Sequence, residues 1–283
     1  MEKMVNHADK KLGYRVARCL AIASLSVTAI PWGELSVAAT PQLAQQTVSL
    51  AQPFQDLKVN GSILIYDLKR NRTYQHNPAR NTQPFLPAST FKILNSLIAL
   101  ETGVIANDLA ILTWDGVERS FPTWNRDLNL QTAFKVSAVW FYQVLARRIG
   151  FQRMQQWVTK VGYGNQSIGK ADEIDTFWLT GDLRISPTEQ IQFLQRLYRN
   201  ELPFSESAIA TVKQIMIVEQ TPEYTIRAKT GWALQPGIGW YVGYVEQNDN
   251  VYFFATNLDI GDQKDLPARA EVTRRSLKAL NLL

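Results

Sequence analysis

The chain has 283 residues, of which 46% are hydrophobic and 19% are charged, and its formal net charge at neutral pH is +5. This composition is typical of a globular protein with one sizeable core, and it excludes a disordered or low-complexity chain. The positive charges are scattered, without a basic block or an arginine-rich helix, so the sequence indicates no nucleic-acid partner.

The first forty residues have the pattern of a secretory leader. Four basic residues precede an apolar run at 19–30, and small residues follow at 37–39. We expect a signal peptide at 1–39, cleaved near Ala39, and export to the periplasm. The apolar run has roughly 12 residues, fewer than the ~20 of a spanning helix, so no stable membrane insertion is expected once the leader is removed. An uncleaved leader acting as an anchor is the alternative.

The only cysteine, Cys19, lies in this leader. The mature chain would therefore contain no disulfide and no thiolate metal site. Because the sequence also lacks a cluster of histidines and carboxylates, we expect no metal. The remaining residues, 40–283, have the length of a single domain.

After a polar linker, alternating apolar residues at 61–67 and turn-forming residues at 69–72 predict a strand and the bend of a hairpin. A mostly helical region follows. The segments with helical periodicity are 91–100, 128–149, 152–161, 186–200 and 206–219. The fourth of these begins with Ser186, Pro187 and Glu189, a typical helix start.

The pattern then changes to period two, which predicts an antiparallel meander, and the chain closes with a helix at 267–280. The meander strands are 224–229, 239–246 and 251–257. Strands at both ends of the chain thus flank a helical middle. We expect an α/β fold of the α+β type, in which an antiparallel sheet with terminal helices carries a helical lobe at roughly 104–220.

Ser89 opens the helix at 91–100, where unpaired backbone N–H groups can stabilise an anion. Lys92 lies about one turn further on, so its amine can reach the Ser89 hydroxyl. A serine nucleophile needs a base, and the only histidines are His7, in the leader, and His76, which we assign to a polar loop. Lysine is therefore the better candidate for the base.

A bare Ser-x-x-Lys is weak evidence, because the pattern occurs again at 167–170. That copy lies among glycines, Gly164 and Gly169, and no apolar helix follows it, which predicts a surface loop. The context of Ser89, not the motif alone, favours a nucleophile.

Three further short segments follow the Ser89 segment along the chain: Ser137-Ala138-Val139, Tyr163-Gly164-Asn165 and Lys229-Thr230-Gly231. With the Ser89 segment they resemble a class D serine β-lactamase of the penicilloyl-serine transferase superfamily, over about residues 55–280. The class A pattern has Ser-Asp-Asn at the second position, and the departure to Ser-Ala-Val is what class D shows. Further segments similar to class D are Phe177-Trp178-Leu179-x-Gly181, Gly239-Trp240-Tyr241-Val242-Gly243 and Trp124 after Phe121-Pro122-Thr123.

This resemblance implies an enzyme that opens the β-lactam ring of penicillin-type antibiotics through an acyl-enzyme on Ser89. It also implies that Lys92, once buried and neutral, is carboxylated by carbon dioxide or bicarbonate and is the general base in both steps. Ser137 would relay a proton to the lactam nitrogen. No other cofactor is implied, and the only partner would be a small-molecule β-lactam.

The remaining roles also come from the resemblance. The oxyanion hole would consist of the backbone N–H groups of Ser89 and Trp232. The substrate carboxylate would be bound by Lys229, Thr230, Gly231 and Arg269. The carbamate pocket would contain Val139, Trp178 and Leu179, and the rim of the site would contain Trp124, Tyr163 and Asn165.

Several alternatives stay open. Plain core packing is an alternative role for Trp178 and Val139, and Tyr-Gly-Asn also fits a helix-ending turn. A β-lactam sensor or a penicillin-binding protein would be acylated at the same serine without turnover. Only one short apolar run precedes the domain, which disfavours a sensor, and Ser-Ala-Val in place of Ser-x-Asn disfavours a D,D-peptidase. The protein is expected to be a monomer or a homodimer.

Overall fold

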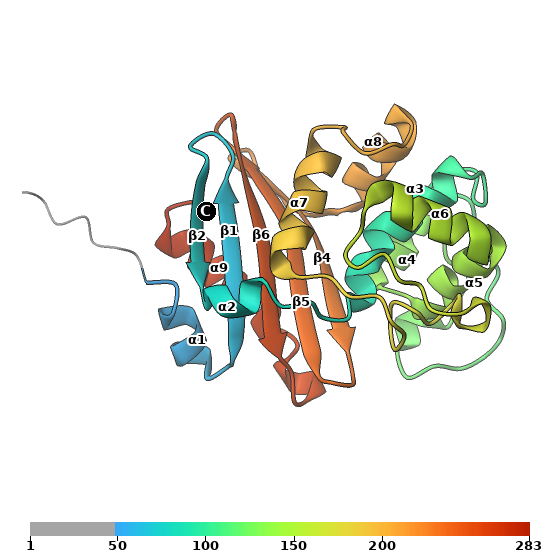
Figure 1. The fold of residues 1–283 in the computed structure, drawn as a ribbon, viewed down its shortest axis with the longest axis horizontal. Helices are drawn as coiled ribbons and strands as arrows, with labels where there is room; N and C mark the ends of the chain where they lie inside the picture. The colour runs from blue at the N-terminus through green and yellow to red at the C-terminus, as the bar shows by residue number, and fades with distance from the viewer. Residues whose placement is uncertain (1–48) are drawn as a thin grey trace, which may run out of the picture. The chain divides into compact units, whose positions relative to one another are not determined.

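The fold is built on a six-stranded antiparallel sheet with the strand order β2-β1-β6-β5-β4-β3 (Figure 1). The computed structural model describes residues 49–283, so the predicted leader, its cleavage site and Cys19 lie outside the described residues. The strands are β1 (Gly61–Asp67), β2 (Arg72–His76), β3 (Ile217–Gln220), β4 (Tyr224–Ala233), β5 (Ile238–Gln247) and β6 (Asn250–Asp259).

Helices cover both faces of the sheet and form the lobe beside it (Figure 1). They are α1 (Gln52–Leu57), α2 (Pro78–Asn81), α3 (Lys92–Glu101), α4 (Leu130–Val136), α5 (Val139–Ile149), α6 (Phe151–Val161), α7 (Pro187–Tyr198), α8 (Glu206–Ile215) and α9 (Ala268–Ala279). The predicted capping box of α7 is present, because Ser186 and Glu189 satisfy each other's backbone N–H groups.

Side chains alternate between the two faces along each central strand. On β6, Tyr252 and Phe254 pack into a cluster with residues of α1 and α9. The intervening Phe253 and Ala255 pack into a larger cluster on the opposite face, which includes residues of α7 and the helical lobe. The sheet is therefore buried on both sides.

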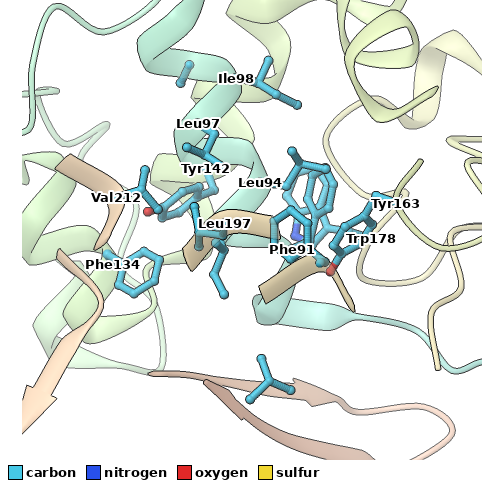
Figure 2. Close-up of a cluster of buried hydrophobic side chains, with 14 of the residues drawn as sticks. Phe91, Leu94, Leu97, Ile98, Phe134, Tyr142, Tyr163, Trp178, Leu197 and Val212 are labelled. Atoms are coloured by element: carbon cyan, nitrogen blue, oxygen red, sulfur yellow. The ribbon is translucent and has the colours of Figure 1, made fainter. Parts of the chain in front are cut away.

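Helix α3 runs through the middle of the helical lobe and carries the Ser89 segment at its start. Residues 93–99 are all buried. Figure 2 shows Leu94, Leu97 and Ile98 of this helix among side chains from α5, α7 and α8, including Tyr142, Leu197 and Val212. A helix surrounded on all sides by packing is a rigid support for the residues at its N-terminus.

The mixed architecture with an antiparallel sheet and a helical lobe confirms the predicted fold class, but several boundaries differ. The segment predicted as one helix at 128–149 is two helices, because Ser137 adopts a left-handed conformation with φ 58°. The last predicted helix before the meander ends at Ile215, and β3 takes up residues 217–220. His76 closes β2 and was wrongly assigned to a loop.

The copy of Ser-x-x-Lys at 167–170 belongs to no helix or strand, as predicted. Within residues 49–283, no helix is both long and apolar enough to cross a bilayer. The same described stretch contains no group of three metal-ligating side chains.

Candidate active site

The Ser89 segment is a tight turn that precedes α3 rather than the first turn of the α-helix. Ala88–Phe91 form a 3-10 helix, and the α-helix begins only at Lys92. Ala88 has φ 48°, a left-handed conformation that a non-glycine residue adopts only when its surroundings hold it. One such contact is the hydrogen bond from the Ala88 N–H to the Trp178 carbonyl, at 2.9 Å. Ser89 is thereby presented at the surface of a cleft while remaining 9% exposed.

Lys92 is fully buried directly behind Ser89. Its Nζ donates a hydrogen bond to Ser89 Oγ at 2.6 Å and lies 5.3 Å from the centre of the Tyr142 ring. Burial lowers the pKa of the amine well below its ordinary value, and the positive charge of Lys229 lowers it further. A neutral amine has a free lone pair, so Lys92 can accept the proton of the serine hydroxyl.

Trp178 is a fully buried residue whose ring stacks on Phe91 at a centroid distance of 5.5 Å. Figure 2 shows Phe91, Trp178 and Tyr163 grouped at the start of α3. The indole Nε1 of Trp178 has no hydrogen-bond partner among the described residues. A buried, unpaired N–H costs about 1–3 kcal/mol, so the site contains a donor suited to an additional acceptor.

Ser137, in the lining of the cleft, and the buried Lys229 form a second pair. Ser137 ends α4 in its left-handed conformation, and Lys229 Nζ donates to Ser137 Oγ at 2.9 Å. Lys229 is only 4% exposed. Burial lowers its pKa to about 7, with a further contribution from the charge of Arg269. This amine can therefore change its protonation state near neutral pH.

The edge of β4 that faces away from β5 supplies backbone donors. The Ala228 N–H points to this side, since it donates to the Met216 carbonyl at 2.8 Å. Because β3 pairs only with the first residues of β4, and N–H groups of alternate residues point the same way, the N–H groups of Thr230 and Trp232 face the open edge. The predicted end of this strand at 229 was wrong, since β4 continues to Ala233.

Gly231 lets this edge approach the Ser89 turn closely. A Cβ atom at this position would lie 3.0 Å from the Pro87 carbonyl oxygen and 3.1 Å from a methyl group of Thr90. Any larger residue would push β4 away from the turn. Arg269, at the start of α9, donates from Nη1 to the Gly231 carbonyl at 2.6 Å, and burial lowers its pKa to about 10.

These elements enclose a cleft of about 470 Å³. Its lining includes nine of the predicted site residues: Ser89, Trp124, Ser137, Val139, Leu179, Thr230, Gly231, Trp232 and Arg269. Lys92, Trp178 and Lys229 are buried next to this lining and complete the set that the structure brings together. The lining also includes residues to which sequence analysis assigned no site role, namely Val136, Thr180, Ala233, Leu234, Gln235 and Leu266.

Two predicted rim residues do not line the cleft. Tyr163 is 1% exposed and packs edge-on against Phe91 at 5.7 Å, so it belongs to the core behind the Ser89 turn. Burial raises the pKa of its hydroxyl. Asn165 instead joins two loops, because its side chain donates to the Asp182 carbonyl and accepts from the Arg184 N–H, both at 2.9 Å. The left-handed Gly162 that ends α6 directs the chain inward here.

A comparison with known families assigns this fold to a class of proteins. The family model of the penicillin binding protein transpeptidase domain matches residues 58–278. The fold is thus that of the penicillin-binding transpeptidase domains.

Similar proteins narrow the assignment. Beta-lactamase OXA-48 of Klebsiella pneumoniae is 42% identical over 266 residues, which covers 92% of this chain and 97% of that protein. The crystal structure of the class D β-lactamase YbXI from Nostoc is 62% identical with a TM-score of 0.82, covering 83% of this chain and 99% of that one. FUS-1 (OXA-85), a class D β-lactamase of Fusobacterium nucleatum subsp. polymorphum, is 41% identical with a TM-score of 0.80, covering 83% and 98%. The chain belongs to the class D β-lactamases, a family of hydrolases.

Proposed function

We propose that this protein hydrolyses the β-lactam ring of penicillin-type antibiotics through an acyl-enzyme on Ser89. The observation that carries the proposal is the 2.6 Å contact between Ser89 Oγ and the fully buried amine of Lys92. A serine next to a neutral amine at a cleft surface is arranged for nucleophilic attack.

In the acylation step, Ser89 Oγ attacks the lactam carbonyl carbon and gives up its proton toward Lys92. The N–H groups of Ser89 and Trp232 would stabilise the resulting oxyanion. The lactam C–N bond then breaks, and the nitrogen takes a proton from Ser137. Lys229 Nζ, which lies 2.9 Å from Ser137 Oγ, can in turn supply that hydroxyl with a proton.

We also propose that the functional form of Lys92 is carboxylated. A neutral, buried amine adds carbon dioxide, and the product would supply a carbamate oxygen as general base. The group fits the site in chemical terms, because the unpaired Nε1 of Trp178 is a donor that an added carbamate could satisfy. Val139 and Leu179 would surround it with apolar surface. No metal takes part in this proposal.

Substrate binding would use two cations at the cleft, Lys229 and Arg269. Penicillins carry a carboxylate, and Arg269 offers planar donors that suit this anion. Lys229 and the hydroxyl of Thr230 lie close by, since Lys229 Nζ is 3.5 Å from Thr230 Oγ1. The apolar side chains of Trp124, Leu179 and others in the lining would contact the antibiotic's side chain.

The test is intact mass against time after the protein is mixed with a slight excess of benzylpenicillin, with and without bicarbonate. A transient adduct that clears, and clears faster with bicarbonate, is expected. Ser89→Ala should form no adduct at all. An adduct that persists for hours would instead indicate a β-lactam sensor or a penicillin-binding protein, and an adduct on Ser89→Ala would place the nucleophile elsewhere.

Export and assembly are also proposals. Cleavage of a leader near Ala39 would release residues 40–283 into the periplasm as one domain, and N-terminal sequencing of the exported protein tests this. The protein is proposed to be a monomer or a homodimer, which light scattering distinguishes.

A further inference from the structure

A buried amide on α7 lies directly behind the Ser89 turn. Gln190 is fully buried, and its Nε2 donates to Thr90 Oγ1 at 2.8 Å. Thr90 Oγ1 in turn donates to the Pro87 carbonyl at 2.8 Å. Two hydrogen bonds therefore join α7 to residues on both sides of Ser89 in the chain, although Gln190 itself does not line the cleft.

The turn that these bonds join requires external support. Ala88, between Pro87 and Ser89, has φ 48°, a conformation that relaxes unless neighbouring contacts hold it. The 3-10 turn sets the direction of the Ser89 side chain relative to α3, and in this arrangement its hydroxyl lies 2.6 Å from Lys92 Nζ. A hydrogen bond to Thr90, the residue after Ser89, therefore restrains the backbone of the turn that orients the Ser89 side chain.

An apolar residue at position 190 would stabilise the folded protein about as well as Gln190 does. Its Oε1 is buried without a partner among the described residues, and burying an unpaired amide oxygen is unfavourable. A methionine of similar volume would fill the same space without this penalty. The amide therefore contributes orientation rather than stability, because its hydrogen bond fixes the position of the Thr90 side chain.

The same contact gives a role to Tyr163, which sequence analysis placed at the rim. Its hydroxyl lies 3.4 Å from Gln190 Nε2, and its ring packs against Phe91 at 5.7 Å. Tyr163 thus confines the Gln190 amide on one side and the residue after Thr90 on the other.

We propose that Gln190 is a positioning residue for the nucleophile: through Thr90 it holds the 3-10 turn so that Ser89 Oγ stays within hydrogen-bond distance of Lys92 Nζ. This rests on the proposed acylation of Ser89. Because Gln190 is separated from bound substrate by the turn, its loss should slow acylation without weakening the initial binding of the antibiotic.

The experiment compares Gln190→Met and Thr90→Val with Thr90→Ser, which keeps the hydroxyl, and with Gln192→Met, a matched control at an exposed position of the same helix. Acylation by benzylpenicillin is followed by stopped flow, per folded molecule, well below the melting temperature. The acylation rate constant should fall about tenfold in Gln190→Met and in Thr90→Val, with an unchanged dissociation constant for the non-covalent complex. Thr90→Ser and Gln192→Met should react as the parent does.

The double variant Gln190→Met with Thr90→Val should be no slower than either single variant, because both remove the same hydrogen bond. Parent-like acylation in Gln190→Met, or losses that multiply in the double variant, would overturn the proposal. If Gln190→Met does not fold, the contrast between Thr90→Val and Thr90→Ser decides in the same way.

If the parent forms no adduct, the proposed function fails separately. The positioning role is then judged from crystal structures of the parent and of Thr90→Val, in which the distance from Ser89 Oγ to Lys92 Nζ should be longer in the variant. An unchanged distance would refute it.

Discussion

Trp178→Phe removes one buried N–H donor next to the Ser89 turn and keeps an aromatic ring in the core. In the parent, Nε1 has no partner among the described residues, and the ring packs against Phe91 and Phe177 at 5.5 and 5.0 Å. If the donor serves a carbamate on Lys92, the variant should lose affinity for carbon dioxide. If Trp178 only fills the core, the variant should keep the affinity of the parent for carbon dioxide.

The two effects differ in size. A hydrogen bond to a charged group contributes about 1.5–3 kcal/mol, which corresponds to roughly a 10- to 100-fold higher bicarbonate concentration for half-maximal activity. Stability should change little. The smaller ring leaves a cavity that costs roughly 1–2 kcal/mol, but the variant no longer buries an unpaired N–H, whose burial costs a similar amount.

The assay is steady-state penicillin hydrolysis over a series of bicarbonate concentrations in degassed buffer, together with thermal unfolding. Trp157→Phe is the control, because Trp157, in α6, stacks on Phe204 at 4.8 Å and does not line the cleft. A bicarbonate dependence of Trp178→Phe equal to that of the parent and of Trp157→Phe would refute the carbamate role of this indole.

Four further outcomes are expected. Lys92→Ala should slow deacylation by roughly 10²- to 10⁴-fold, the usual contribution of a general base, so that the penicillin adduct persists in mass spectra; deacylation at the parent rate would contradict the assignment. Because the pKa of Lys229 is about 7, this amine loses its charge as the pH rises above 7, and KM for penicillin should increase there. Arg269→Ala removes a neighbouring cation and should move the midpoint of that KM profile to higher pH; an unmoved midpoint would argue against coupling of the two groups. Gly164→Ala places a Cβ 2.0 Å from the Arg184 carbonyl oxygen at a residue with φ 54°, so thermal unfolding should show a loss of more than about 1 kcal/mol, and an unchanged melting temperature would disprove the clash.

Local features of the chain were predictable from the sequence. Ser89 and Lys92 are three residues apart, and any helical turn brings such a pair together. The capping box at Ser186 and the alternation of β4, β5 and β6 are equally local, since they depend on side chains within four residues or on period two. The predicted helix boundaries were wrong where one residue with an unusual backbone conformation interrupts a periodic pattern, as Ser137 does between α4 and α5.

Contacts between distant segments could not be read from periodicity. Lys229 and Ser137 are 92 positions apart, and Gln190 and Thr90 are 100 apart. Their meeting depends on how the sheet and the helical lobe pack together. The resemblance to class D named Ser137 and Lys229 as separate site residues without predicting their contact, and no motif indicated Gln190 or its contact with Thr90.

The sequence by itself therefore determined the class of fold, the order of most elements and the close pairing of Ser89 with Lys92, because each of these is encoded by residues close together in the chain. Only the tertiary structure decided that Tyr163 is a core residue behind the Ser89 turn and that Asn165 joins two loops outside the cleft. It also decided how far the pKa of each amine is lowered, because the pKa of Lys92 and of Lys229 depends on burial by residues far away in the sequence.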